Sequence, residues 1–152
     1  MLNAAFLVYD RTLFSGVTRP YEILKAVNAM ARLDRDPRPL NIEMVKIEDP
    51  QPKVAGDIPL NIEKKLQDLG HLDWIFIPPN WRDPGYILKK YPKLPAMLKE
   101  RYRDGTKFIA TGAGVYFLAE AGLLRDTPAT THWYFFDDFE RRYPRVELKK
   151  QH

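Results

Sequence analysis

The stretch between residues 108 and 124 constrains the fold more than any other part of the sequence. A short apolar segment, residues 108–110, runs into a turn of small residues, 111–114, and then into a helical pattern, 115–121. A strand that turns sharply into a helix forms an elbow, the shape that presents a nucleophile above a parallel sheet. Here the centre of the turn is Gly-Ala-Gly, and the chain contains no cysteine. The sequence therefore predicts the elbow of an enzyme without its reactive atom.

Apolar runs typical of strands alternate with helical patterns along the whole chain. Strands are expected at residues 2–9, 41–48, 72–78, 106–110, 128–132 and 145–149, with a short strand pair around residues 54 and 58. Helices are expected at residues 21–33, 62–69, 92–102, 115–121 and 135–143. This alternation predicts an α/β fold, a three-layer sandwich with a mainly parallel, flavodoxin-like sheet and helices on both faces.

Several local features refine this outline. Pro20 is expected to open the first helix, with Ile23, Leu24, Val27 and Ala31 as its buried stripe. Gly122 is expected to end the elbow helix in a left-handed conformation. In such a sheet ligands bind beyond the carboxyl ends of the strands. Three loops are expected to meet at that edge: residues 10–20, 78–85 and 111–114.

Length and composition limit the kinds of function that the chain can have. A chain of 152 residues is expected to form one domain, and the absence of cysteine excludes disulfides, thiolate zinc sites and thiol catalysis. No apolar run approaches the roughly 18 residues of a membrane span, so a soluble cytoplasmic protein without membrane contact is expected. The net charge of +4 is spread along the chain and indicates a solvated basic surface rather than nucleic-acid binding. The last strand pattern, residues 145–149, has no evident partner, so the domain over residues 1–152 is expected to be incomplete at its C-terminal end.

Several segments together resemble the ThiJ/PfpI superfamily of glutamine-amidotransferase-like α/β domains. More narrowly, the chain resembles the N-terminal domain of AraC/XylS-type transcriptional regulators of that superfamily. The segments that carry the resemblance are residues 20–24 (PYEIL) with Asn28, 114–124 (GVYFLAEAGLL), 129–133 (ATTHW) and 139–144 (FERRYP). The resemblance covers essentially the whole chain.

The resemblance also implies which residues occupy the site. In enzymatic relatives the elbow carries a cysteine, an acid from the first helix reaches it, and a histidine often lies nearby. These positions correspond to Gly112, Glu22 and His132 in this sequence. Glycine has no side chain, so covalent catalysis through a thiolate is impossible there, and no catalytic residue is predicted. The alternative is a degenerate hydrolase or amidase in which Glu22 or His132 activates a water molecule.

The same positions could instead bind a ligand. Pocket candidates are Glu22, the elbow residues Gly112, Ala113 and Gly114, His132, and the rim residues Trp81 and Arg82. Each also has a structural interpretation. Glu22 could be an exposed acid near a helix start, the elbow glycines could serve close packing, His132 could be a hydrogen-bonded structural residue, and the rim loop could pack on another subunit or domain. The histidines lack metal-ligand spacing, and no cofactor motif is present, so neither a metal nor a cofactor is predicted.

The resemblance implies a sensor. It implies a homodimeric, non-catalytic domain that binds a small-molecule effector and relays binding to a C-terminal helix-turn-helix domain. That DNA-binding domain is absent from these 152 residues, so DNA contact is expected only through it. A third interpretation is a structural or dimerising remnant of such a domain, with a filled pocket. The aromatic residues 134–136 are expected in the core or at an interface.

Overall fold

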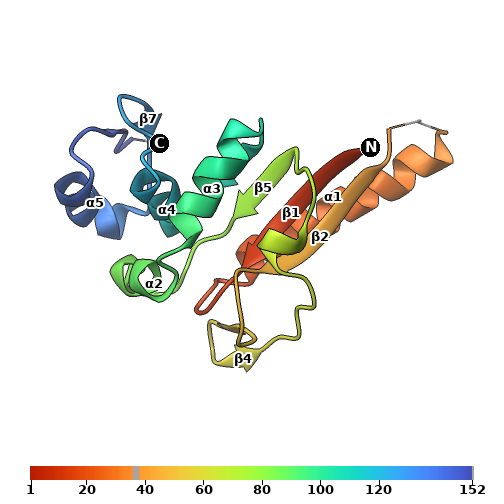
Figure 1. Cartoon of the computed structure of the whole chain (residues 1–152), viewed down its shortest axis with the longest axis horizontal. Helices are drawn as coiled ribbons and strands as arrows, with labels where there is room; N and C mark the ends of the chain where they lie inside the picture. Colours follow the sequence, from red (N-terminus) through yellow and green to blue (C-terminus); the bar gives the residue numbers. More distant parts are fainter. Residues whose placement is uncertain (36–37, 152) are drawn as a thin grey trace.

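A four-stranded parallel sheet forms the centre of the computed structural model, which describes residues 1–35 and 38–151. The strands are β1 (Leu2–Val8), β2 (Leu40–Lys46), β5 (Trp74–Ile77) and β6 (Lys107–Ala110), in the order β2-β1-β5-β6. Figure 1 shows β2, β1 and β5 side by side. All three pairings are parallel. Residues 4–9 are buried, as expected for an apolar strand at the centre of such a sheet.

Helices cover both faces of the sheet, which confirms the three-layer α/β sandwich. On one face α1 (Ser15–Leu33) packs mainly on β1 and β2 (Figure 1). The other face is covered by α2 (Pro84–Lys90), α3 (Leu94–Arg103) and α4 (Val115–Glu120), which share one core with the sheet. The short helix α5 (Phe136–Arg142) packs against α4 through Phe139.

The first helix differs from its predicted form in its start and in its buried side. It begins at Ser15, so Pro20 lies inside it rather than at its first turn. The buried residues are Val17 and Asn28, whereas Ile23 and Val27 are exposed. The predicted stripe is therefore wrong for Ile23 and Val27, whereas Leu24 does pack against the core. The Asn28 amide group exchanges two hydrogen bonds with the backbone of Leu40 on β2, and this contact sets which side of α1 faces the sheet.

The segment before β5 also departs from its helical pattern. Only one 3₁₀ turn, η1 (Leu66–Asp68), forms where a helix over residues 62–69 was expected. The side chain of Gln51 bonds both backbone groups of Ile62, and the Lys46 amide donates to the carbonyl of Lys64 at 3.0 Å. These tertiary bonds occupy the groups that a helix would need. The expected strand pair is present as β3 (Lys53–Val54) and β4 (Ile58–Pro59).

Two elements near the C-terminus correct the sequence-based outline. The predicted strand over residues 128–132 is shorter, β7 (Pro128–Ala129), and it pairs in parallel with β8 (Glu147–Leu148). The last strand therefore has a partner, contrary to expectation. Gly122 follows α4 with a φ of +73°, which confirms its left-handed conformation.

Among the described residues, no helix is both long and apolar enough to cross a membrane.

Candidate functional site

The elbow is present with the predicted geometry. Strand β6 ends at Ala110, a 3₁₀ turn η2 (Gly112–Gly114) follows, and α4 begins at Val115. Gly112, which the resemblance places at the nucleophile position, has a φ of +51°, the left-handed conformation that favours glycine. The buried Thr131 donates a hydrogen bond of 3.2 Å to the Gly112 carbonyl and holds the turn in place.

A cavity of the described chain lies beside this elbow. It measures about 660 Å³, and its lining residues come from the loops after β1, β5 and β6 and from the segment around η3 (Trp133–Phe135). The lining residues are Leu13, Asn80, Trp81, Arg82, Asp83, Pro84, Ala113, His132, Tyr134, Phe135 and Asp138. The three loops that the sequence analysis expected to meet each contribute to this lining. The cavity lies beyond the carboxyl ends of the strands, where open α/β sheets bind ligands.

The rim loop after β5 is braced against the loop after β1. The Leu13 amide donates to the Pro79 carbonyl at 2.9 Å, and the Trp81 amide donates to the Arg11 carbonyl at 2.6 Å. Arg82 has a φ of +67°, and the buried Asn80 amide group holds its carbonyl at 3.2 Å. A non-glycine residue in this conformation is strained, so these bonds fix the rim beside the cavity.

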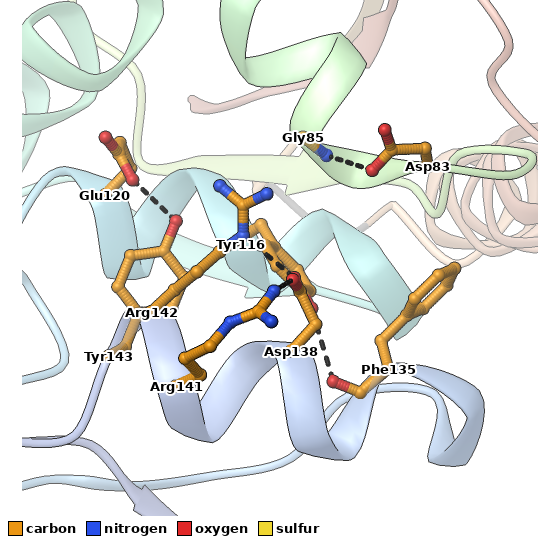
Figure 2. Close-up of polar contacts among 9 residues, drawn as sticks. All are labelled: Asp83, Gly85, Tyr116, Glu120, Phe135, Asp138, Arg141, Arg142 and Tyr143. Atoms are coloured by element: carbon orange, nitrogen blue, oxygen red, sulfur yellow. Dashed lines mark hydrogen bonds and ion pairs between the residues drawn. The ribbon is translucent and has the colours of Figure 1, made fainter.

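The opposite wall of the cavity is the segment from His132 to Asp138. His132 caps η3, because its Nδ1 accepts a hydrogen bond of 3.2 Å from the Tyr134 amide. Behind Asp138 lies Tyr116 of α4, whose hydroxyl donates to Asp138 Oδ2 at 3.0 Å and contacts the Phe135 carbonyl at 3.3 Å (Figure 2). The wall is therefore attached to the elbow helix by this tyrosine.

Two arginines complete the cluster behind the wall (Figure 2). Arg142 donates to Asp138 Oδ2 at 2.9 Å, and Arg141 donates to Oδ1 at 2.6 Å. Partial burial alone would raise the pKa of Asp138, but the Tyr116 hydrogen bond and the two guanidinium groups outweigh it and lower the pKa. Burial, with the Asp138 hydrogen bond and charge, raises the pKa of Tyr116. Asp138 thus presents an ionised carboxylate to the cavity.

The structure brings together four of the predicted site residues, Trp81, Arg82, Ala113 and His132. Gly112 and Gly114 do not line the cavity. At Gly114 a Cβ atom would lie 2.6 Å from the carbonyl oxygens of residues 77 and 78, so this glycine serves close packing of helix on strand.

Glu22 also lies outside the cavity lining and is exposed on α1. The predicted placement assumed a helix that starts at Pro20. Because α1 starts at Ser15, the carboxylate stands two turns into the helix instead of in its first turn. Glu22 therefore does not accompany His132 at the elbow, which leaves His132 as the remaining candidate of the two bases that the hydrolase alternative named.

Sequence reasoning missed three wall residues and one helix. Tyr134, Phe135 and Asp138 line the cavity, although the aromatic residues were expected in the core or at an interface. The missed helix is α2, whose start has a readable signal. Asp83 caps it by accepting the Gly85 amide at 2.8 Å, and Pro84 occupies its first turn. Among residues 1–35 and 38–151, no group of three His, Cys, Asp or Glu side chains could hold a metal ion.

Comparison with known sequences yields two short matches. No protein-family model matches the chain. A stretch of 55 residues is 44% identical to "HTH-type transcriptional regulator ArgR" of Pseudomonas aeruginosa, and covers 36% of this chain. A stretch of 60 residues is 35% identical to "HTH-type transcriptional regulator CdhR" of the same organism, and covers 40% of this chain. These matches span only 17% and 18% of the two regulators.

Solved structures match the whole chain. A structure described as a transcriptional regulator protein of Vibrio parahaemolyticus matches 99% of this chain and 77% of its own, with a TM-score of 0.86 and 23% identity. An AraC family regulator of Pseudomonas putida matches 98% of this chain and 76% of its own, with a TM-score of 0.75 and 18% identity. DJ-1 of Schizosaccharomyces pombe matches 99% and 77%, with a TM-score of 0.71 and 17% identity. The chain thus has the DJ-1/ThiJ/PfpI-like fold, and its resemblance to the ThiJ/PfpI-like domain of AraC-type transcriptional regulators is confirmed.

Proposed function

We propose that this chain is the ligand-sensing and dimerising domain of an AraC-type transcriptional regulator and performs no catalysis. A small molecule binds in the cavity between the rim loop, residues 80–84, and the wall segment, residues 132–138. Binding is relayed to a C-terminal helix-turn-helix domain of the longer polypeptide, which contacts DNA. The matched regulators are several times longer than the matched stretches, which supports this arrangement.

One observation carries the proposal. A cavity of about 660 Å³ lies beside an elbow that keeps the backbone of a nucleophile site but has glycine in the nucleophile position. Cavities of this size suit a small metabolite, and the lining combines aromatic rings with a few charged groups. The site therefore has the features of a binding pocket without a reactive atom.

The relay follows from which elements form the two walls. The rim loop follows β5 of the central sheet, whereas the wall segment continues into α5 and the last residues of the chain. A ligand that contacts both walls favours the arrangement in which α5 is closely docked, and so shifts the population of domain arrangements in the dimer. The size of this population shift is limited by the difference in the ligand's affinity for the two arrangements.

The test is a thermal-unfolding screen of the chain against a metabolite library. A ligand present at 100 times its Kd stabilises the folded state by about 2.7 kcal/mol. For a domain of this size, that corresponds to a rise in Tm of roughly 5–10 °C. Tyr134→Ala should abolish the rise, because Tyr134 lines the cavity. Tyr102→Ala is the matched control, since Tyr102 is exposed on α3 and outside the cavity.

Two outcomes would contradict the sensing role. One is that no compound raises the Tm, and the other is that both tyrosine variants respond alike to a compound that does. Sedimentation of the chain with and without ligand tests the dimer separately. A monomer under both conditions would remove dimerisation from the proposal and leave ligand binding intact.

A further inference from the structure

The charged side chains that line the cavity differ in what neutralises them. Two of them are the aspartates Asp83 and Asp138, and one is the arginine Arg82. Other groups of the protein balance the charges of the two aspartates, whereas the arginine has no such partner. This difference determines which kind of ligand the cavity favours, because a buried charge needs an opposite charge beside it.

Both carboxylate oxygens of Asp138 are engaged by the protein. Oδ1 accepts from Arg141 at 2.6 Å, and Oδ2 accepts from Arg142 at 2.9 Å and from the Tyr116 hydroxyl at 3.0 Å. Two guanidinium groups thus surround a single carboxylate. The aspartate in the cavity wall is therefore not a free negative charge for a cationic ligand.

Asp83 borders one of these guanidinium groups. Its Oδ1 accepts the Gly85 amide at 2.8 Å, at the start of α2. A Cβ atom added at Gly85 would lie 2.6 Å from Arg142 Nη2 and 3.1 Å from Asp83 Oδ1, so both side chains lie against the same glycine (Figure 2). Arg141 and Arg142 together therefore balance the charges of the two aspartates.

Arg82 is the cation that remains at the cavity. Its side chain is exposed, and among residues 1–35 and 38–151 its guanidinium group makes no hydrogen bond, ion pair or aromatic contact. Its main chain is fixed, with a φ of +67° and the carbonyl held by the Asn80 amide group. The loop thus places an unpaired guanidinium group at the rim. Such a group binds a carboxylate through two parallel N–H donors.

His132 and two aromatic rings complete the binding surface. Because Nδ1 of His132 accepts the Tyr134 amide, the proton of the neutral imidazole lies on Nε2, which is left as a donor. Trp81 and Tyr134 line the cavity and are 52% and 71% exposed. Aromatic rings that remain this accessible beside a cavity suit a flat apolar ligand. The unused polar groups are thus donors, so the ligand must supply acceptors.

We propose that the effector is a monocarboxylate with a flat apolar body, such as an aromatic acid. Its carboxylate pairs with Arg82, its body lies against Trp81 and Tyr134, and an oxygen of the ligand accepts from His132. One unpaired cation matches one carboxylate, whereas a phosphate monoester would bring a charge of about −1.5 to −2. The inference rests on the proposal that this cavity binds an effector.

The experiment measures the rise in Tm of the 152-residue chain with benzoate, phenylacetate and cinnamate at millimolar concentration. Each acid is compared with its neutral amide and with the amine of the same ring system, which is a cation at neutral pH. The acids should stabilise the chain, because only they can pair with Arg82. The amides and the amines should give little or no rise.

Two variants test the assigned contacts, with Kd measured by titration of the acid that stabilises most. Arg82→Gln should weaken binding about tenfold, as expected for loss of a hydrogen-bonded charge pair. Arg103→Gln is the matched control, since Arg103 is exposed on α3 and outside the cavity lining. His132→Asn should also weaken binding and leave the Tm of the free chain unchanged, because asparagine can still cap η3 but lacks Nε2.

Three results would overturn the inference. The amides or amines could stabilise the chain as well as the acids do. Arg82→Gln or His132→Asn could bind the acid as tightly as the natural chain. None of the acids could raise the Tm while the metabolite library yields a ligand of another class, and the sensing role would then stand without this ligand class. Failure of the sensing role itself is distinguishable, because in that case neither the library nor the acids would stabilise the chain.

Discussion

Gly114 shows at the scale of one residue why the elbow is built from small side chains. The turn brings α4 so close to β5 that a Cβ atom at this position would lie 2.6 Å from the carbonyl oxygens of both Ile77 and Pro78. Backbone oxygens at the end of a strand cannot move aside as a flexible side chain can. Close packing was the alternative to ligand contact expected for the elbow glycines, and the geometry assigns it to Gly114.

Gly114→Ala should therefore destabilise the chain, because either α4 or the end of β5 must shift. Overpacking of this kind costs about 1–3 kcal/mol. Urea unfolding would measure the change as a lower midpoint with an unchanged slope. Gly70→Ala is the matched control, since a Cβ atom at Gly70 meets nothing within 4 Å. Equal midpoints for the two variants would show that the elbow tolerates a side chain.

At the scale of elements, the docking of α5 on α4 forms one wall of the cavity. Tyr116 is buried in contact with Phe139 and Tyr143, with ring centroids 5.1 Å and 5.8 Å away. Its hydroxyl also reaches Asp138, as described above. The attachment thus combines aromatic packing with one charge-assisted hydrogen bond. The aromatic part sets the position of α5, and the hydrogen bond orients the carboxylate in the cavity wall.

Tyr116→Phe should loosen this attachment without removing the ring. The loss of one hydrogen bond to a partly exposed carboxylate is expected to cost about 1 kcal/mol of unfolding free energy. Hydrogen exchange should rise in α5 and remain unchanged in β1. Tyr102→Phe, on an exposed side chain of α3, is the control and should change neither quantity. An unchanged α5 in Tyr116→Phe would mean that aromatic packing alone holds the wall.

The lowered pKa of Asp138 predicts how this attachment depends on pH. The folded state holds the ionised carboxylate better than the unfolded chain, whose aspartates titrate near about 3.9. The resulting stability is fully present above that value and is lost as the pH falls through the lower pKa of the folded state. The stability difference between the natural chain and Asp138→Asn should therefore be constant at neutral pH and shrink below about pH 4. Urea unfolding of both proteins across this pH range measures the difference in stability. A stability difference that persisted at acid pH would exclude the ion pair as its source.

At the scale of the whole molecule, the sheet separates two cores of unequal size. The core on the side of α3 and α4 contains Leu7, Ile75 and Leu98, whereas the core under α1 is centred on Phe6 and Val8. Ile75 lies on the central strand β5 and is fully buried. The stability of the described chain should therefore depend mainly on this larger core.

Ile75→Ala should destabilise the whole chain by about 2–5 kcal/mol, the range for removing a large aliphatic side chain from a close-packed core. Thermal and urea unfolding should show this loss of stability for the entire domain, because both cores share the sheet. Ile58→Ala in the β3–β4 hairpin is the control, because Ile58 is largely exposed. A similar loss of unfolding free energy in both variants would show that the stability does not depend mainly on the larger core.

The sequence by itself determined the fold class, the elbow and the lack of a nucleophile. The buried strands and the small-residue turn at Gly112 are local patterns of apolar and small residues, which can be recognised from the sequence without knowledge of their neighbours. The same holds for Gly122, whose left-handed conformation ends α4. The resemblance to regulator domains likewise rests on short segments that can be read directly from the chain.

Only the tertiary structure decided which surfaces those elements share. The buried side of α1 depends on the contact of Asn28 with β2, and the start of this helix at Ser15 leaves Glu22 exposed and outside the cavity. The wall residue Asp138 comes from a helix far along the chain that Tyr116 attaches to the elbow. The physical reason is that periodicity shows that a helix has an apolar face, whereas burial depends on which neighbours are present to cover it. Trp74 is apolar by sequence and partly exposed in the fold for that reason.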